Sequence, residues 1–416
     1  MVRLADLRAA EAVFALPAET RAAVEEIVRA NLETVVPALA LTVVHGGDVR
    51  LNAAWGWLDP ETRQRPAGPD TLFDLASVTK LFTTTAFLGL AAAHRLDLDA
   101  PLADIVPEFA ASGPRAIEGG QDPHTRDRLP TPDQWAGQTA DPQRVTLRHL
   151  LTHTSGLAPW RDVFNAAGPP PPPPPGQPDP LPRRERWARG LAAICGYPFV
   201  GQPDGATVRY SDLGLMLLGE AVARLGGAPG DLDTIIRARV TGPLGLDTVM
   251  FNPVSAGWPR ASIAPTEDDP AWRGRRVWGE VHDENACGVG GVAGHAGLFA
   301  AARDVAALGQ AWLDDNPRLG IPLPLLRAAV QEHAETDGMR RGLGWLIKPH
   351  EGASAGDALS ARAYGHTGFT GTSLWVDPDR RLVIACLTNN VYYGRLKPGL
   401  YEFRRALHTA IAAGLG

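Results

Sequence analysis

The chain has 416 residues and a formal net charge of −6, and 44% of its residues are hydrophobic while 21% are charged. These values are ordinary for a globular protein, so they exclude an intrinsically disordered chain and give no reason to expect a nucleic-acid partner. A chain of this length can bury a sizeable core, as one composite domain or as two packed subdomains.

The N-terminal region shows no targeting pattern. Acids and arginines interrupt every apolar run in residues 1–33, so we expect a helix there and no signal peptide. No run elsewhere approaches 18 apolar residues, which predicts no contact with a membrane. Cys195, Cys287 and Cys386 are far apart and lack metal or redox spacing. We therefore expect buried free thiols in a reducing, cytoplasmic compartment.

The first predicted elements are a hairpin and a buried helix. Residues 38–57 hold two β-rich runs around Gly46 and Gly47, a pattern typical of a β-hairpin. The segment LFTTTAFLGLAAAHRL after Ser77 is apolar on nearly every side, as a helix in the core of a large protein is. We expect this helix to run out just before Pro101, because proline cannot continue it.

Two stretches are predicted as insertions. Residues 111–144 are rich in Gly, Pro, Asp and Gln without apolar periodicity, which indicates a surface insertion. Residues 161–185 form the second, and they contain seven consecutive prolines, Pro169–Pro175. Such a tract is an extended polyproline spacer. A plain surface loop is favoured over a docking motif for an SH3-like partner in a sequence so rich in proline.

The second half of the chain alternates helices, a glycine-rich turn and strands. The turn has no Gly-Lys-Ser/Thr after it and no β-run before it, so close backbone packing is favoured over a phosphate cradle. Strands at both ends of the chain with helices between predict one antiparallel sheet that joins the first hairpin to the last three strands. The predicted elements are helices over 207–250, the turn at 289–300 leading into a helix, strands at 341–348, 364–376 and 381–388, and a helix from about 398 to 413.

One lysine lies where chemistry needs an amine. The chain has three lysines among its 40 Lys and Arg residues, and Lys80 follows Ser77 by three positions in FDLASVTKLF. On a helix this spacing places both side chains on one face, about 5 to 6 Å apart at Cβ. A serine nucleophile needs a base, which a lysine of lowered pKa can be and an arginine cannot. The pattern alone also fits a helix N-cap serine followed by a solvated lysine.

Four motifs in chain order give the strongest indication. They are ASVTK at 76–80, LLTHTSGL at 150–157, YSDLG at 210–214 and GHTGFTGTSLWVDP at 365–378. Together they resemble the serine β-lactamase and penicillin-binding-protein superfamily, and most of all its class C and carboxylesterase-like branch. The resemblance covers roughly residues 38–410 apart from the two insertions.

The resemblance implies a fold of α/β (α+β) class with a β-lactamase-like arrangement. Residues 1–416 would form a single domain in which an antiparallel sheet is flanked by helices. Its α/β sheet subdomain would comprise residues 38–99 and 291–416. Residues 100–290 would form a mostly helical subdomain that carries the insertions 111–144 and 161–185.

The resemblance also assigns roles to residues. Ser77 would be the acylated nucleophile, Lys80 its base partner and Tyr210 the residue that passes a proton to the leaving group. His366-Thr367-Gly368 matches the Lys-Thr-Gly triplet that lines the substrate site. The backbone N–H groups of Ser77 and Phe369 would form the oxyanion hole. Without the motif, Tyr210 would be interpreted as a core tyrosine with a hydrogen-bonded hydroxyl.

Two substrate-binding positions depart from the best-known pattern. Asp212 stands where β-lactamases and D,D-peptidases usually have Asn, and its charge would hold Lys80 protonated, so that Tyr210 does more of the proton transfer. His366 stands where the lysine normally attracts a substrate carboxylate, as in some D,D-peptidases, and it would make that recognition pH-dependent. Both departures argue against an efficient β-lactamase.

Three further patterns are weaker. Residues 352–356 fit the Gly-x-Ser-x-Gly elbow of α/β-hydrolases, but no helix follows them. His149 and His153 are spaced like metal ligands on a helix, yet the stretch lacks the glutamate of a zincin. His282 and His295 lie near acidic residues, where loop hydrogen bonds are favoured over a metal site.

The sequence therefore predicts a serine hydrolase that works through an acyl-enzyme on an ester, amide or β-lactam substrate. We expect no metal or other cofactor, and a small molecule or short peptide as the partner. A first alternative is a D,D-peptidase or D-amino-peptide hydrolase in cell-wall recycling. A second is a non-catalytic binding module, whose ligand affinity would be indifferent to the change Ser77→Ala.

Overall fold

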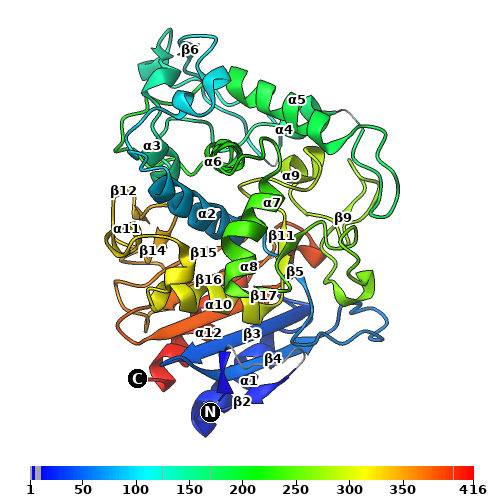
Figure 1. The fold of residues 1–416 in the computed structure, drawn as a ribbon. Coiled ribbons are helices and arrows are strands. Elements are labelled where there is room, and N and C mark those ends of the chain that lie inside the picture. The colour runs from blue at the N-terminus through cyan, green and yellow to red at the C-terminus, as the bar shows by residue number, and fades with distance from the viewer. Residues whose placement is uncertain (1, 5–10, 124, 169, 397) are drawn as a thin grey trace.

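A ten-stranded antiparallel sheet forms one half of the molecule in the computed structural model, which describes residues 2–4, 11–123, 125–168, 170–396 and 398–416 (Figure 1). The strand order is β1-β4-β3-β17-β16-β15-β14-β13-β12, and β2 pairs with β4. The strands are β1 (Val2–Arg3), β2 (Val13–Phe14), β3 (Ala38–His45), β4 (Asp48–Gly56), β12 (Ala334–Thr336), β13 (Met339–Arg341), β14 (Leu346–Ile347), β15 (Tyr364–Thr367), β16 (Ser373–Asp377) and β17 (Leu382–Thr388).

The centre of the sheet joins the two ends of the chain, as predicted. A tight turn at Gly46 and Gly47 joins β3 to β4, and the φ angles of these two residues, +63° and +84°, favour glycine. The other edge of β3 pairs with β17 along its whole length, from Leu39 opposite Thr388 to His45 opposite Leu382. The predicted hairpin and the shared antiparallel sheet are therefore confirmed.

The two faces of the sheet pack on different helices. Successive strand residues point to opposite faces, and Leu39, Leu41 and Val43 of β3 belong to a core with α1 (Ala18–Asn31) and α12 (Leu400–Gly414). The opposite face packs against α10 (Ala302–Leu313). Trp312 of α10 donates a hydrogen bond to the Thr85 hydroxyl of α2 (Thr79–Ala93) at 3.0 Å, which ties the layer above the sheet to the helix that begins next to Ser77.

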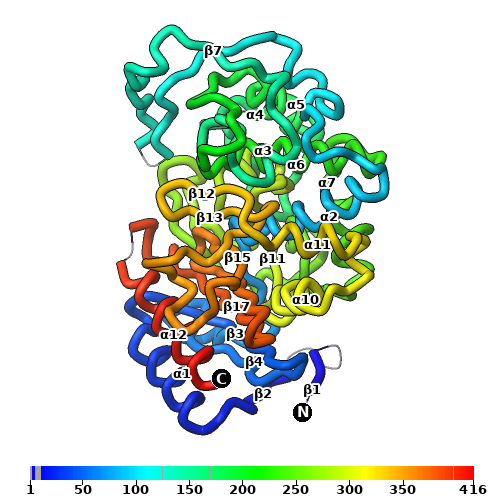
Figure 2. Tube along the Cα trace, turned by 90° about the vertical axis from the view of Figure 1, so that its left-hand side faces the viewer, coloured from blue at the N-terminus to red at the C-terminus, as the bar shows by residue number. Residues whose placement is uncertain are grey.

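Most of the other helices lie on the far side of α2 from the sheet (Figure 1, and from the side in Figure 2). α2 packs against α6 there. A π-helical turn, Arg237–Thr241, joins α7 to α8, and β5, β11 and β8 form a small separate sheet. Beyond α2 lie α3 (Leu147–Thr152), α4 (Val163–Ala167), α5 (Arg183–Gly196), α6 (Asp212–Leu225) and α9 (Glu284–Gly288). The remaining elements are α7 (Leu232–Ile236), α8 (Gly242–Leu244), α11 (Leu323–Ala329), β5 (Phe73–Asp74), β8 (Met250–Phe251) and β11 (Leu298–Ala300).

The helix α2 is apolar because it is buried. Residues Ala76–Ala93 are long and apolar enough to cross a membrane, but 78% of this window is buried inside the protein. The helix ends at Ala93, earlier than the predicted end near Pro101.

The predicted N-terminal helix is confirmed only over Ala18–Asn31, because residues 2–3 and 13–14 are strands. Two predictions of single strands were wrong. Residues 341–348 hold the end of β13, a tight turn and β14, and not one strand, because Gly344 adopts a φ of +76° in the turn. Residues 364–376 likewise hold two strands, β15 and β16, with Gly371 at φ +116° between them.

The insertions differ in how they attach. Residues 111–144 are mostly irregular, as predicted, with one short strand pair, β6 (Arg115–Ala116) and β7 (Thr139–Ala140). Pro169 lies outside the described residues, and residues 170–175 have no regular secondary structure. The Pro172 carbonyl accepts a hydrogen bond from Arg275 at 3.0 Å, and the prolines line a cavity of about 370 Å³. The tract is therefore bound to the body of the protein and is not a free spacer.

Candidate active site

Ser77 lies in a strained turn between β5 and α2. The preceding residue, Ala76, has φ +44°, a left-handed conformation that is costly for alanine. Asp74 compensates by accepting a hydrogen bond from the Ala76 N–H at 2.8 Å. The hydroxyls of Thr370 and Thr372, in the β15–β16 turn, donate to backbone carbonyls of residues 74 and 75 at 2.7 and 2.9 Å. These bonds fix the position of Ser77 relative to β15.

Lys80 lies one helical turn further and is only 1% exposed. Its Nζ is 2.8 Å from Ser77 Oγ, 2.8 Å from Asp212 Oδ1 and 3.0 Å from the His295 carbonyl oxygen. An ammonium has three donors, and each has an acceptor here. Burial alone would lower the pKa of Lys80, but the Asp212 carboxylate and the Tyr210 phenol outweigh it and raise that pKa. Lys80 therefore rests as an ammonium.

Tyr210 reaches Ser77 from the start of α6. Ser211 is the N-cap of that helix and accepts a hydrogen bond from the Gly214 N–H, which explains why the helix begins directly after the tyrosine. The Tyr210 hydroxyl donates to Ser77 Oγ at 2.9 Å. Burial raises the pKa of Tyr210, Lys80 lowers it, and the net shift is upward. The resting phenol is therefore neutral.

His153 supports this tyrosine. It ends α3 in a left-handed conformation, φ +59°, and its ring centroid is 4.6 Å from that of Tyr210. Its Nδ1 accepts a hydrogen bond from the Ser211 N–H at 3.0 Å. The LLTHTSGL motif thus holds the segment that carries Tyr210. His149 has a separate part in the capping box of the same helix, with Nδ1 accepting from the Thr146 N–H.

The triplet His366-Thr367-Gly368 lies at the end of β15, beside Tyr210. β14 pairs with β15 only at Tyr364 and Gly365, so within the described part of the chain the triplet has no strand partner on that edge. The ring of His366 is 5.9 Å from the ring of Tyr210. Burial, followed by the charges of Lys80 and Arg341, lowers the pKa of His366 well below 6.5. At neutral pH this imidazole carries no charge with which to attract a carboxylate.

The turn after the triplet is held close to Ser77. A Cβ on Gly368 would lie 2.1 Å from Thr372 Oγ1 and 2.5 Å from the Leu75 carbonyl oxygen, so only glycine permits this approach. Arg404 of α12 donates to the carbonyl oxygens of Gly368 and Thr372 at 3.0 and 2.7 Å. Phe369 follows directly, and its side chain stacks on His282. The pairing of the Ser77 and Phe369 N–H groups as an oxyanion hole stays a prediction.

An acidic cluster lies against Lys80. His295 Nε2 is 2.8 Å from Asp283 Oδ1, the kind of loop contact that the sequence predicted. Burial would raise the pKa of Asp283, but His295 and Lys80 bring it below the ordinary range. Possible ligand atoms of Asp212, Asp283 and His295 lie within 4.8 Å of one another, and the Lys80 ammonium already pairs with this cluster through Asp212. His282 pairs with Glu267 at 3.1 Å.

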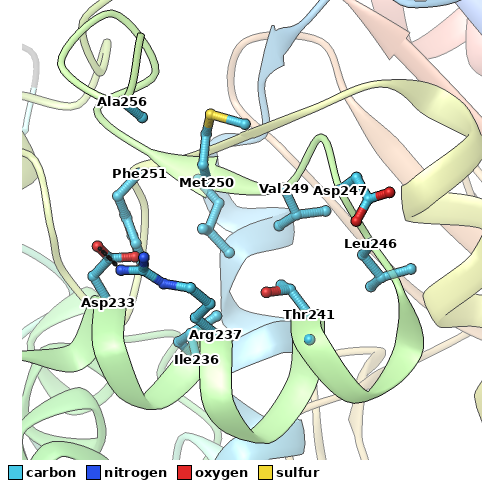
Figure 3. A pocket seen from close by; sticks show the side chains of 12 residues that line it. Asp233, Ile236, Arg237, Thr241, Leu246, Asp247, Val249, Met250, Phe251 and Ala256 are labelled. Carbon is cyan, nitrogen blue, oxygen red and sulfur yellow. Dashed lines mark hydrogen bonds and ion pairs between the residues drawn. The ribbon is translucent and has the colours of Figure 1, made fainter. Parts of the chain in front are cut away.

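Two other features are separate from this site. Residues 352–356 form a loop between β14 and β15, so Ser354 has no strand–turn–helix around it. A pocket of about 320 Å³ borders the π-helical turn, with the ion pair of Asp233 and Arg237 at its edge (Figure 3). None of the predicted site residues lines that pocket.

Nothing in the sequence distinguishes Arg341 and Arg404 from the many other arginines, although both lie at the site. His153 had a signal in its motif, but its contact with Tyr210 depends on how α3 and α6 pack. Asp283 had only its proximity to His282 as a signal.

The fold and this constellation define a serine hydrolase. The profile of the Beta-lactamase family matches residues 21–408, and the chain belongs to that family. A protein of Escherichia coli (strain K12) with the provisional name D-alanyl-D-alanine carboxypeptidase is 30% identical over 382 residues, which are 85% of this chain and 78% of that protein.

Solved structures show the same fold. A penicillin-binding-protein homologue from Caulobacter crescentus has a TM-score of 0.65 and 22% identity, covering 97% of this chain and 100% of that chain. Simvastatin synthase (LovD) from Aspergillus terreus has a TM-score of 0.68 and 21% identity, with 95% and 99% covered. The predicted β-lactamase-like fold and the predicted family are thus confirmed.

Proposed function

We propose that the protein transfers the acyl group of an ester or amide to Ser77 and then to water. The observation that carries this proposal is the arrangement around Ser77 Oγ, which has Lys80 Nζ at 2.8 Å and the Tyr210 hydroxyl at 2.9 Å. A serine in reach of two titratable groups has what nucleophilic catalysis requires, a proton acceptor and a proton donor.

The proton transfers follow from the resting state. Lys80 and Tyr210 are close enough to titrate as a pair, with Nζ 4.9 Å from the centre of the ring. When the pair loses one proton, it accepts the proton of Ser77 as Oγ bonds to the acyl carbon. The bond to the leaving group then breaks, and Tyr210 gives that group a proton. Water repeats the steps in reverse order and releases the acid.

A peptide ending in a D-amino acid is our leading acyl donor. The Escherichia coli relative, at 30% identity, supports this substrate through its name. The edge of β15 beyond Gly365 supports it independently, because an extended peptide can add to such an edge as a further strand. Esters and β-lactams remain alternative donors for the same nucleophile.

The test is intact-protein mass after mixing with p-nitrophenyl acetate and, separately, with benzylpenicillin. We expect an adduct or a burst of p-nitrophenol with the wild type and none with Ser77→Ala. Ser354→Ala is the matched control, because it removes the serine of the competing Gly-x-Ser-x-Gly pattern, and it should react like the wild type. An adduct that persists in Ser77→Ala would overturn the proposal. Ligand binding that is unaffected by Ser77→Ala, without turnover, would indicate a binding module.

A further inference from the structure

Arg341, the last residue of β13, is a buried guanidinium without a counter-charge. Its residue is 7% exposed, and its Nε is fully buried with no hydrogen-bond partner. Among the described residues no carboxylate or carbonyl pairs with this side chain, whose guanidinium lies over the ring of the neutral Tyr210. Two other buried arginines have acids, since Arg186 pairs with Asp179 at 2.7 Å and Arg273 with Asp269 at 3.2 Å. Buried Arg115 and Arg404 have no acid but donate to backbone carbonyls, which the described residues do not supply to Arg341. An unpaired buried charge is strongly unfavourable unless a ligand completes it.

This guanidinium lies beside the reactive centre. Its Cζ is 5.1 Å from the ring centroid of Tyr210, whose hydroxyl contacts Ser77. It also acts electrostatically on His153 and His366, the two imidazoles that flank the tyrosine. The charged groups that act on those imidazoles are Lys80 and Arg341, and no acid of the described residues is among them. This side of the site is therefore positive.

We infer that Arg341 binds a carboxylate on the leaving group of the substrate, so that the preferred acyl donors carry a free carboxylate there, as a peptide with a free C-terminus does. The inference rests on the proposed function and adds a substrate class to it. A guanidinium can hold a carboxylate through two parallel N–H bonds. His366, neutral at pH 7, cannot supply that charge.

The position of Arg341 indicates which part of the substrate it meets. In the proposed mechanism Tyr210 gives its proton to the leaving group, so the leaving group lies next to Tyr210. Arg341 packs against the face of that same ring. A carboxylate held there belongs to the leaving group and not to the acyl part, because the acyl carbon is bonded to Ser77.

If the role of Arg341 were purely structural, a different result would be expected. If the guanidinium only supported the ring of Tyr210, its removal would slow all substrates equally. The inference requires a loss confined to anionic substrates.

The experiment uses two thioesters with the same acyl group. One releases thioglycolate, which carries a carboxylate, and the other releases methyl thioglycolate, which does not. We expect the wild type to prefer the anionic thioester in kcat/KM by about 10-fold to 100-fold, the range of a charge-assisted hydrogen bond. Arg341→Gln should abolish the preference, because its loss of kcat/KM on the anionic thioester should exceed its loss on the neutral thioester by about 10-fold to 100-fold. Arg341→Lys should keep part of the preference, because an ammonium is a point charge rather than a fork.

The matched control is Arg340→Gln. It removes the same charge from the neighbouring residue, whose guanidinium is bonded to Glu332 and to the Lys348 carbonyl. The preference for the anionic thioester should survive this change. Equal losses on both thioesters in Arg341→Gln, or a wild type without preference, would overturn the inference.

A binding measurement separates this inference from the proposed function. In the Ser77→Ala background, calorimetry compares N-acetyl-D-alanine with N-acetyl-D-alanine amide. We expect the acid to bind and the amide to bind at least about 10-fold more weakly, and this difference to vanish in Ser77→Ala/Arg341→Gln. The result stands even if no substrate is turned over. Conversely, a Ser77 adduct without discrimination between acid and amide would leave the proposed function intact and remove Arg341 from it.

Discussion

The charged groups on the two sides of Ser77 differ in whether they are paired within the chain. On one side the Lys80 ammonium has three acceptors within 3.0 Å, and Asp283 is paired with His295. On the other side Arg341 has no partner among the described residues, and His153 and His366 are neutral. Charges that are fully paired within the chain set the protonation state of the catalytic groups. A charge left unpaired in the same cleft is available to a ligand. The predictions below test this contrast.

The largest effect should come from Lys80→Arg. An arginine keeps the positive charge beside Asp212 but cannot take a proton, so acylation by p-nitrophenyl acetate should fall about 10²-fold to 10⁴-fold. Lys348→Arg is the control, because Lys348 lies elsewhere and donates to the Leu359 carbonyl. Acylation by Lys80→Arg at a rate near that of the wild type would show that Tyr210 needs no titratable amine beside it.

Arg404→Lys tests the third buried cation at the site. Arg404 donates to two carbonyls of the turn that contains Phe369, one before and one after that residue, and a lysine cannot reach both in the same geometry. We expect kcat to fall about 10-fold with KM nearly unchanged, since positioned donors act on the transition state. A thermal melt on the same samples identifies a loss that comes from unfolding. Equal changes in kcat and KM would place Arg404 outside the positioning of the turn.

Asp212→Asn should make the enzyme faster near neutral pH. The Asp212 carboxylate helps to raise the pKa of Lys80, so its removal disfavours the ammonium and lowers that pKa. More of the base form is then present at pH 7, and acylation there should rise about 10-fold for each unit of pKa lost. The pH–rate profile should move to lower pH, whereas Asp133→Asn, an exposed acid in the insertion, should not move it. A profile unchanged by Asp212→Asn would remove this carboxylate from the mechanism.

The last prediction concerns stability in acid and not catalysis. His408, on the opposite face of the sheet, is fully buried, and burial lowers its pKa to about 4. The unfolded chain binds a proton at His408 at higher pH than the folded protein does. The contribution of neutral His408 to the free energy of unfolding is therefore complete above about pH 6.5 and is lost as the pH falls toward 4. The loss amounts to ~3 kcal/mol. Urea unfolding at pH 7 and pH 4.5 measures it, and His408→Gln should show a smaller difference between the two pH values.

The residues that the sequence located are those whose relation is local. Ser77 and Lys80 face each other because they are one helical turn apart, and Tyr210 was found through a motif that starts a helix with its N-cap serine. The pairing of β3 with β17 followed from strands at both ends of the chain. The first inference needed only a spacing, the second the resemblance of a motif to a family, and the third the positions of strand-like runs along the chain.

The residues that the sequence did not locate depend on tertiary packing. Arg341 matters because none of the acids that the structure describes pairs with it, and a missing neighbour leaves no trace in a sequence. Arg404 lies on a helix whose apolar pattern says nothing of the carbonyls it meets. Residues 341–348 were taken for a single strand because apolar alternation does not register the positive φ that Gly344 adopts between β13 and β14.

The pairing of β3 with β17 has a consequence for folding during synthesis. The Ala38 N–H bonds to the side chain of Asn389, across 351 positions of the chain. During synthesis one edge of β3 therefore stays unpaired until β17 has emerged from the ribosome. An unpaired strand edge can pair with other chains and cause aggregation. A nascent chain halted before β17 should aggregate, whereas one that has just passed it can close its sheet and bring Ser77 to its partners.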